Sequence, residues 1–172
     1  KLLDQVVRER TRELETAYSN LKAANRQLLL GIAMVIEAKD AYTEGHCGRV
    51  AGYALGLARA VGYPEADMER LEYSSYLHDI GKIAVADAVL KKPAALDDAE
   101  WKHMRTHPVV GDQIASKIEL LRPFRGAIRH HHERWDGDGY PDRLRGEQIP
   151  IDARIVCIAD AWDAMITDRP YK

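Results

Sequence analysis

The sequence predicts an all-α protein, and three observations support this prediction. Apolar residues recur at helical spacing along most of the chain, and no alternation of period two extends beyond four residues. Glycine and proline stand where the periodic segments stop, as they do at helix ends. With 46% hydrophobic and 30% charged residues, the 172-residue chain has the composition of one globular domain with an appendage. Its formal net charge of -2 gives no reason to expect nucleic acid as a partner.

The first 38 residues carry a heptad pattern without proline. Its a positions are Val7, Leu14, Leu21, Leu28 and Val35, and its d positions are Leu3, Ala17, Ala24 and Gly31, interrupted by Arg10. Such a seam predicts a coiled-coil helix that forms a homodimer and relays a signal from an upstream sensor or receiver domain. The alternative is an amphipathic helix that packs on its own domain. We predict a boundary after residue 38, with the signalling and dimerisation helix before it.

Two helices are predicted in the next part of the chain. The stretch VAGYALGLARAV, residues 50–61, is rich in small and apolar residues at helical spacing and is stopped by Gly62 and Pro64. The stretch MERLEYSSYLHDIGK, residues 68–82, carries its apolar side chains on the same face as His78. This histidine is therefore expected near the end of a helix.

Two more helices are predicted toward the C-terminus. The stretch DDAEWKHMRTHP opens with Asp97 and Glu100 in the positions of a capping box. Its proline marks a limit or a kink, which places His107 at the helix end. The stretch PIDARIVCIADAWDAMI is periodic and carries Pro150 as a first-turn proline.

Histidine and carboxylate side chains recur in these segments in a way that favours a metal centre. Three of the seven histidines are consecutive, at residues 130–132, and Glu133 follows them. The other candidate ligands are His46, His78, Asp79, His107 and Asp160. Asp160 lies in an apolar helix, where an unpaired carboxylate would be costly to bury. Imidazole and carboxylate together suit a divalent metal such as Fe, Mn, Zn or Ni.

Two consecutive histidines can bind one ion only where a helix ends. Adjacent helical residues point about 100° apart, because a turn takes 3.6 residues. We therefore predict a helix end at the histidine run. Glu133 is expected to orient an imidazole through its second nitrogen.

The motifs in these segments resemble those of a known family. YLHDIGKI, residues 76–83, resembles the signature of the HD superfamily of metal-dependent phosphohydrolases. HHERWDGDGYP, residues 131–141, followed by IPIDARIVCIADAWDAMITDRPY, resembles the HD-GYP family, which hydrolyses cyclic di-GMP. The resemblance runs from about residue 40 to the C-terminus. It implies an HD-type helical bundle around a dinuclear metal site, with residues 39–172 as an HD-GYP phosphodiesterase domain.

The resemblance also implies a role for individual residues. One ion would be bound by His46, His78, Asp79 and Asp160, and the other by Asp79, His107, His131 and His132. His130 is then expected to lie at the surface or behind the ligands. Asp79, as the bridge between the ions, and Lys82, in contact with the scissile phosphate, would be the catalytic residues. Lys82, Tyr140 and Arg169 would hold the phosphates or bases of the substrate.

Two departures from the family pattern bear on these expectations. Some members bind a third metal with a glutamate four residues before the first ligand histidine, where this chain has Tyr42. We therefore expect two divalent ions, Fe or Mn first, with Zn, Ni or Mg as alternatives. The family usually continues into further helices where this chain ends at Lys172, so we expect a C-terminally truncated domain.

The resemblance implies metal-dependent hydrolysis of cyclic di-GMP to linear pGpG, to GMP or to both, in bacterial second-messenger signalling. The alternatives are a catalytically weak cyclic di-GMP receptor that signals through its coiled coil, and a broader HD-type nucleotide phosphohydrolase. Cys47 and Cys157 indicate no disulfide framework, so a cytoplasmic location is expected. The longest apolar run, residues 28–36, is shorter than the roughly 20 residues that span a bilayer, so no direct membrane contact is expected.

Overall fold

The computed structural model describes residues 2–39 and 45–167, and helices are the only regular elements in these ranges. The α-helices are α1 (Leu2–Lys39), α2 (His46–Ala60), α3 (Met68–Leu77), α4 (Asp87–Leu90), α5 (Asp98–Met104), α6 (His107–Lys117), α7 (Arg125–His130) and α8 (Ile151–Ile166). Short 3-10 helices are η1 (Glu65–Asp67), η2 (Ile80–Ala84), η3 (Glu119–Phe124) and η4 (Gly146–Gln148). The all-α prediction is confirmed. None of the described helices combines the length and the apolar character needed to cross a membrane.

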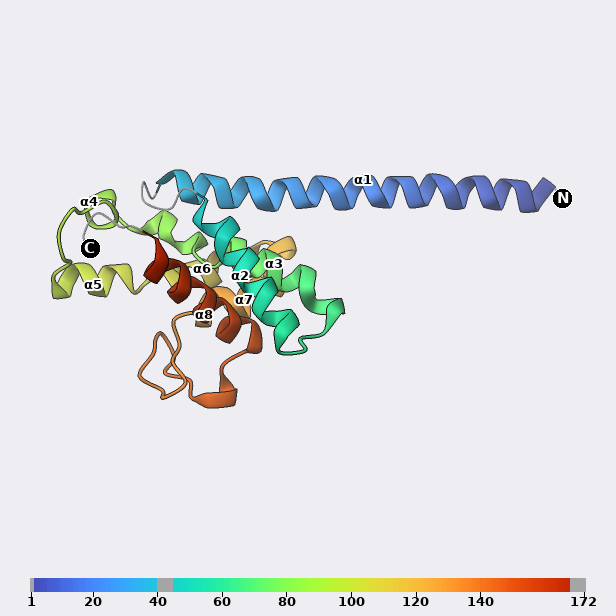
Figure 1. Ribbon diagram of the computed structural model, residues 1–172. Helices are drawn as coiled ribbons and strands as arrows, with labels where there is room; N and C mark the ends of the chain where they lie inside the picture. The colour runs from blue at the N-terminus through green and yellow to red at the C-terminus, as the bar shows by residue number, and fades with distance from the viewer. Residues whose placement is uncertain (1, 40–44, 168–172) are drawn as a thin grey trace.

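Helix α1 is the longest element, and only its C-terminal half contacts the rest of the protein, with ion pairs from Lys22 and Arg26 to α3 and buried side chains closer to its end. Its buried residues are Leu29, Ala33 and Ile36, which lie on one face. Figure 1 shows the N-terminal part of α1 extending well beyond the helical bundle. The heptad seam lies on a different face, since Leu28 is 54% exposed and Val35 is 62% exposed. The helix therefore does not use its seam to pack on its own domain.

Two clusters of buried side chains form the core, and α3 and α7 contribute to both. The first includes Val50, Ala54, Ala58, Leu71, Ala127, Ile155, Val156 and Ala159. The second includes Leu29, Ile36, Tyr73, Leu77, Ala115, Leu121, Phe124 and Ile128. The small side chains of α2 let α3 and α8 pack closely against it, as the composition of this helix predicts.

The predicted helix boundaries are right at the start of α5 and wrong at its end. Asp97 and Glu100 form the expected capping box. The prediction that His107 ends this helix is wrong, because His107 is the first residue of α6. The following Pro108 lies in the first turn of α6, where a missing N–H costs no hydrogen bond. Pro150 stands directly before α8 instead of inside its first turn.

The turn that follows α3 lies directly against the start of α6. A Cβ added to Gly81 would lie 1.8 Å from the backbone oxygen of His107, so only glycine permits this approach. Lys39, the last residue of α1, binds the same turn. Its ammonium donates to the backbone oxygens of Ile83, at 2.7 Å, and Val85, at 2.5 Å. The close approach of this turn to α6 positions the residues on both sides of it.

We expect Gly81→Ala to lower the free energy of unfolding by about 1–3 kcal/mol, because the added methyl group would overlap a backbone atom. Gly52→Ala is the matched control, since nothing lies within 4 Å of an added Cβ on this exposed face of α2. The control should raise stability by about 0.5–1 kcal/mol, the difference between glycine and alanine in a helix. Urea unfolding measures both changes. Wild-type stability in Gly81→Ala would contradict the close approach.

Candidate metal centre

The ligands predicted from the sequence lie around one buried space, most of them at helix ends. Two stand at the first residue of a helix (α2 and α6), four directly follow a helix (α3 and α7), and one lies within α8. In chain order these are His46, His78, Asp79, His107, His131, His132 and Asp160. The predicted helix end at the histidine run is confirmed, because α7 ends at His130.

Two groups of ligand atoms share the carboxylate of Asp79, and within each group the atoms lie no more than 4.8 Å apart. One group is His46, His78 and Asp79, and the other is Asp79, His107, His131 and His132. One oxygen of Asp79 lies 3.3 Å from Nε2 of His78, and the other lies 3.3 Å from Nε2 of His107. Asp160 stands beside the first group, with its Oδ1 3.4 Å from Nε2 of His46.

Backbone hydrogen bonds fix the orientation of three rings. In His78, His107 and His131, Nδ1 lies 2.7, 2.7 and 2.9 Å from the backbone oxygen three residues earlier in the chain. A carbonyl oxygen only accepts hydrogen bonds, so Nδ1 donates in each ring. Nε2 is then the nitrogen with the lone pair whenever the ring is neutral, and such a nitrogen is a common metal ligand.

A carboxylate orients His46 in the same way. Nδ1 of His46 lies 2.7 Å from Oδ2 of Asp163, which is almost fully buried on α8. Arg49 donates to the same carboxylate at 2.7 Å. A carboxylate on the outer nitrogen of a histidine fixes the ring and strengthens its inner nitrogen as a ligand. The sequence analysis missed Asp163, although its position one turn after Asp160 on an apolar helix is a usable signal.

The inner nitrogens leave buried lone pairs that face one another. Nε2 of His107 and Nε2 of His131 lie 3.2 Å apart, and neither can donate while the proton is on Nδ1. Nε2 of His78 is buried and has no hydrogen-bond partner among the described residues. Buried lone pairs without donors are costly unless a cation lies between them. The donor set therefore fits divalent metal ions and indicates metal dependence.

Burial and the charge of Asp79 act on these rings in opposite directions. Burial disfavours the protonated ring, but Asp79 raises the pKa of His78 to about 9. Burial lowers the pKa of His131, and it lowers the pKa of His132 to about 3. The pKa of Asp79 lies well below its usual range, because Lys82 and His78 outweigh the effect of burial. The site thus offers an anionic carboxylate at Asp79 and neutral rings at His131 and His132, the protonation states that bind metal. The ring of His78 would release its proton when it binds a metal ion.

The ligands face a cavity of about 700 Å³, and two of the predicted substrate-binding residues line it. Nζ of Lys82 lies 2.7 Å from Oδ2 of Asp79. The ring of Tyr140 stacks on that of His132, with 4.8 Å between the centroids. Arg169 and Tyr42 lie outside the described residues. Lys82 and Tyr140 therefore stand beside the candidate ligands, at the wall of the cavity.

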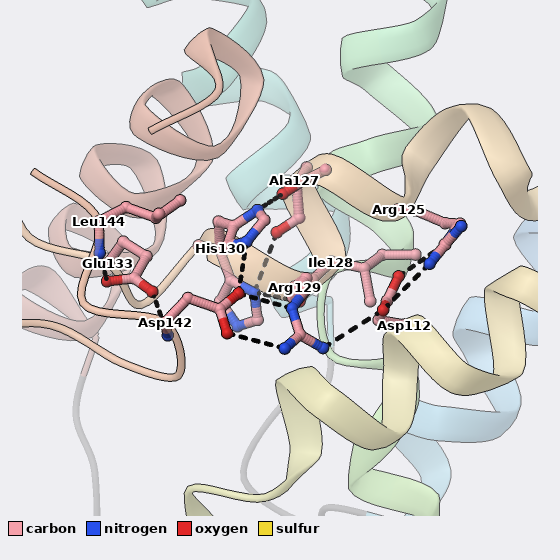
Figure 2. A network of polar contacts seen from close by, with 11 residues as sticks. Asp112, Arg125, Ala127, Ile128, Arg129, His130, Glu133, Asp142 and Leu144 are labelled. Atoms are coloured by element: carbon pink, nitrogen blue, oxygen red, sulfur yellow. Dashed lines mark hydrogen bonds and ion pairs between the residues drawn. The ribbon is translucent and has the colours of Figure 1, made fainter. Parts of the chain in front are cut away.

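Glu133 holds the loop that carries Tyr140. Its buried carboxylate accepts hydrogen bonds from the backbone N–H groups of Asp142, at 2.7 Å, and Leu144, at 3.1 Å (Figure 2). The expectation that Glu133 orients an imidazole is therefore wrong, because each of its oxygens binds the loop backbone instead. A buried carboxylate that accepts two backbone N–H groups compensates for its own desolvation and anchors the loop.

Asp142 joins the same loop to α7 and, through α7, to α6. Its carboxylate accepts from Nε of Arg129 at 2.7 Å, and its Oδ2 lies 2.9 Å from Nε2 of His130. Arg129 also binds Asp112 of α6, and Asp112 binds Arg125 at 2.6 Å (Figure 2). The hydrogen bond from Arg129 lowers the pKa of Asp142 to about 2. His130 thus contacts the loop and belongs to neither ligand group.

We expect Asp163→Asn to weaken the binding of a divalent cation roughly 10- to 100-fold, because asparagine lacks the anionic acceptor that orients His46. Calorimetric titration with Mn²⁺ measures the affinity. Asp152→Asn is the matched control, since it removes another buried carboxylate of α8, which binds Tyr63 and Arg70. The control should lower stability without changing the affinity. Equal losses of affinity would mean that general destabilisation is the cause.

Comparison with known proteins places the chain among HD domains. The HD domain family matches residues 20–172. A 3'3'-cGAMP-specific phosphodiesterase 2 of Vibrio cholerae is 40% identical, over 89% of this chain and 30% of the relative. A cyclic di-GMP phosphodiesterase response regulator of Xanthomonas campestris is 38% identical, over 96% and 46%. A cyclic di-GMP phosphodiesterase of Thermotoga maritima is also 38% identical, over 81% and 38%. This chain therefore spans less than half the length of these relatives.

A solved structure shares the fold. The HDG"Y"P protein from Bdellovibrio bacteriovorus superposes with a TM-score of 0.61 and 22% sequence identity, over 74% of this chain and 42% of the other. The family match takes in every described candidate ligand, from His46 to Asp160. The resemblance found in the motifs is thus confirmed, and the chain belongs to the HD domain family.

Proposed function

We propose that this chain hydrolyses a phosphodiester bond of a cyclic dinucleotide, with cyclic di-GMP as the principal substrate, at a centre of two divalent ions. Two ligand groups that share Asp79 and face one cavity carry this proposal. Relatives named for cyclic di-GMP and for 3'3'-cGAMP support the substrate class. Because three of the relatives are named for 3'3'-cGAMP, this dinucleotide is the second candidate.

The two ions would be held by the two groups of side chains. The first ion takes His46, His78, Asp79 and Asp160, and the second takes Asp79, His107, His131 and His132. All are imidazole or carboxylate ligands, which suit Fe or Mn first and Zn, Ni or Mg as alternatives. When bound, a pair of such ions lowers the pKa of a water molecule and neutralises the charge of a phosphate.

Lys82 and Tyr140 contribute to the reaction from the wall of the cavity. The Lys82 ammonium, 2.7 Å from Asp79, stands where it can donate to a phosphoryl oxygen and stabilise the charge that develops in the transition state. Burial raises the pKa of Tyr140, so its phenol keeps its proton and can donate to a substrate phosphate. Arg169 stays a predicted third contact to the substrate.

We expect Asp79→Ala to abolish hydrolysis of cyclic di-GMP and to release bound metal, because it removes the shared ligand. His130→Ala, which alters a neighbour that faces the loop, should still bind two ions per chain. Elemental analysis counts the ions, and chromatography of the products (pGpG, GMP or both) measures hydrolysis. Similar metal losses in the two variants would mean that the ligand pair is His130 and His131. One or three ions in the fully loaded wild type would contradict a dinuclear centre.

The alternative functions, a cyclic di-GMP receptor and a broader phosphohydrolase, differ from the proposed one in their expected rates of hydrolysis. A cyclic dinucleotide phosphodiesterase should cleave cyclic di-GMP far faster than bis(p-nitrophenyl) phosphate, because the cavity contacts more of the dinucleotide. Equal rates would favour the broader enzyme. Tight binding without turnover in any metal-loaded form would favour the receptor.

We also infer that the chain dimerises through α1. The a-position residues Leu14 and Leu21 are exposed on a helix that extends beyond the bundle (Figure 1). The domain leaves this seam free, since it packs on Leu29, Ala33 and Ile36 instead. Two parallel helices would bury the seam symmetrically, with small residues at most d positions allowing close contact. The upstream sensor or receiver domain stays a prediction.

We expect the double variant Leu14→Glu, Leu21→Glu to sediment as a monomer, because it places four like charges in the seam of a dimer. Ser19→Glu is the control, since residue 19 lies on the outer face of the heptad. Analytical ultracentrifugation distinguishes the species, and metal content should be unchanged in both variants. A wild type that sediments as a monomer at high concentration would refute the dimer.

A further inference from the structure

We propose that Arg105 binds the second, non-reacting phosphate of the cyclic dinucleotide and thereby selects substrates with two phosphodiester groups. This inference rests on the proposed function and names a specificity residue for it. Arg105 follows α5 directly and lines the cavity of the metal centre, two residues before the candidate ligand His107. None of the motifs quoted for the family resemblance contains this residue.

The part of the wall that carries Arg105 comes from other elements than most of the candidate ligands. Residues of α4, α5 and the segment between them line the cavity together with Asp160 and Ala164 of α8. Figure 1 shows α4 and α5 to one side of the bundle, beyond the C-terminal end of α8. A cavity of about 700 Å³ bounded in this way is larger than one phosphodiester group needs. This wall therefore faces the part of a substrate that does not react.

Two aromatic rings hold the guanidinium of Arg105 in place. Its Cζ lies 5.4 Å from the ring centroid of Tyr140 and 5.6 Å from that of Trp101. In such contacts the cation lies over the face of an aromatic ring. The five N–H donors of Arg105 form no hydrogen bond within the described residues, so they are available for a bidentate contact with phosphate. Arg105 is therefore oriented before a ligand arrives.

The charge of Arg105 is also uncompensated. Among the cations that line this cavity, Lys82 pairs with Asp79, and Lys92 pairs with Glu100 at 2.5 Å. Arg105 forms no ion pair within residues 2–39 and 45–167. An anionic group of the substrate would thus meet Arg105 without first displacing a carboxylate.

Ring contacts connect this position to the metal centre. His132 stacks on Tyr140 at 4.8 Å, and Tyr140 in turn contacts Arg105. The ring of Tyr140 therefore lies between Arg105 and the candidate ligand His132, so a phosphate bound at Arg105 would be separated from one bound at the metal centre by about the size of this ring. A substrate with two phosphodiester groups can reach both positions, whereas a diester with one phosphate reaches only the centre.

Arg105→Ala tests this inference through two substrates of the metal-loaded chain. We expect the KM for cyclic di-GMP to rise roughly 10- to 100-fold, the loss of one charge-assisted contact, with little change in kcat. Hydrolysis of bis(p-nitrophenyl) phosphate, which has one phosphate, should be unchanged. Arg105→Lys should be intermediate, because lysine keeps the charge but not the planar donor group. Lys102→Ala, an exposed cation of the same helix, is the control and should behave as the wild type.

Each outcome decides the inference. Equal losses on the two substrates would place Arg105 at the reaction centre and overturn it, as would an unchanged KM for cyclic di-GMP. If the loaded wild type hydrolyses neither substrate, the proposed function fails. Calorimetry with cyclic di-GMP on wild type and Arg105→Ala then decides the inference separately. A Kd that rises by a similar factor supports the second-phosphate contact, and an equal Kd refutes it.

Discussion

The buried carboxylate of Asp79 is the constraint on which the rest of the structure depends. A buried, charged carboxylate is tolerated only where cations or donors surround it. Lys82, from the next turn of the chain, supplies an ammonium 2.7 Å away. The rings of His78, from the end of α3, and His107, from the start of α6, stand 3.3 Å from the two oxygens of Asp79, where they can share a cation with it. The absence of a side chain at Gly81 lets these segments meet. Desolvation of one side chain thus dictates how the end of α3 and the start of α6 pack.

Local hydrogen bonds prepare the imidazoles before any metal binds. Three rings bond to a carbonyl three residues earlier, so the same turn that places each histidine also sets its tautomer. His46 relies instead on Asp163, a residue far away in the chain. The centre therefore combines local preorganisation with one long-range contact, and that contact couples α2 to α8.

The sequence predicted those features whose interacting residues are close together in the chain. The capping box of Asp97 and Glu100 was predictable because its two hydrogen bonds lie within one turn. Five of the seven candidate ligands could be named because the quoted motifs contain them, and the helix end at the histidine pair followed from the angle between adjacent residues. Contacts between distant segments could not be read in this way. Asp163 acts on a ring 117 residues away, and Glu133 binds a loop backbone that no pattern places beside it.

The contact between Lys39 and the turn after α3 links any movement of α1 to that turn. The ammonium of Lys39 donates to the carbonyls of Ile83 and Val85, one and three residues after Lys82. A helix transmits displacement along its axis with little compression, and one residue corresponds to about 1.5 Å. If α1 moved along its axis by this rise of about 1.5 Å, the distances from Lys39 to its two acceptors would leave the range in which hydrogen bonds form. A displacement of the projecting end of α1 would therefore act on the turn after α3, beside Lys82, to which the other end of the helix is bonded.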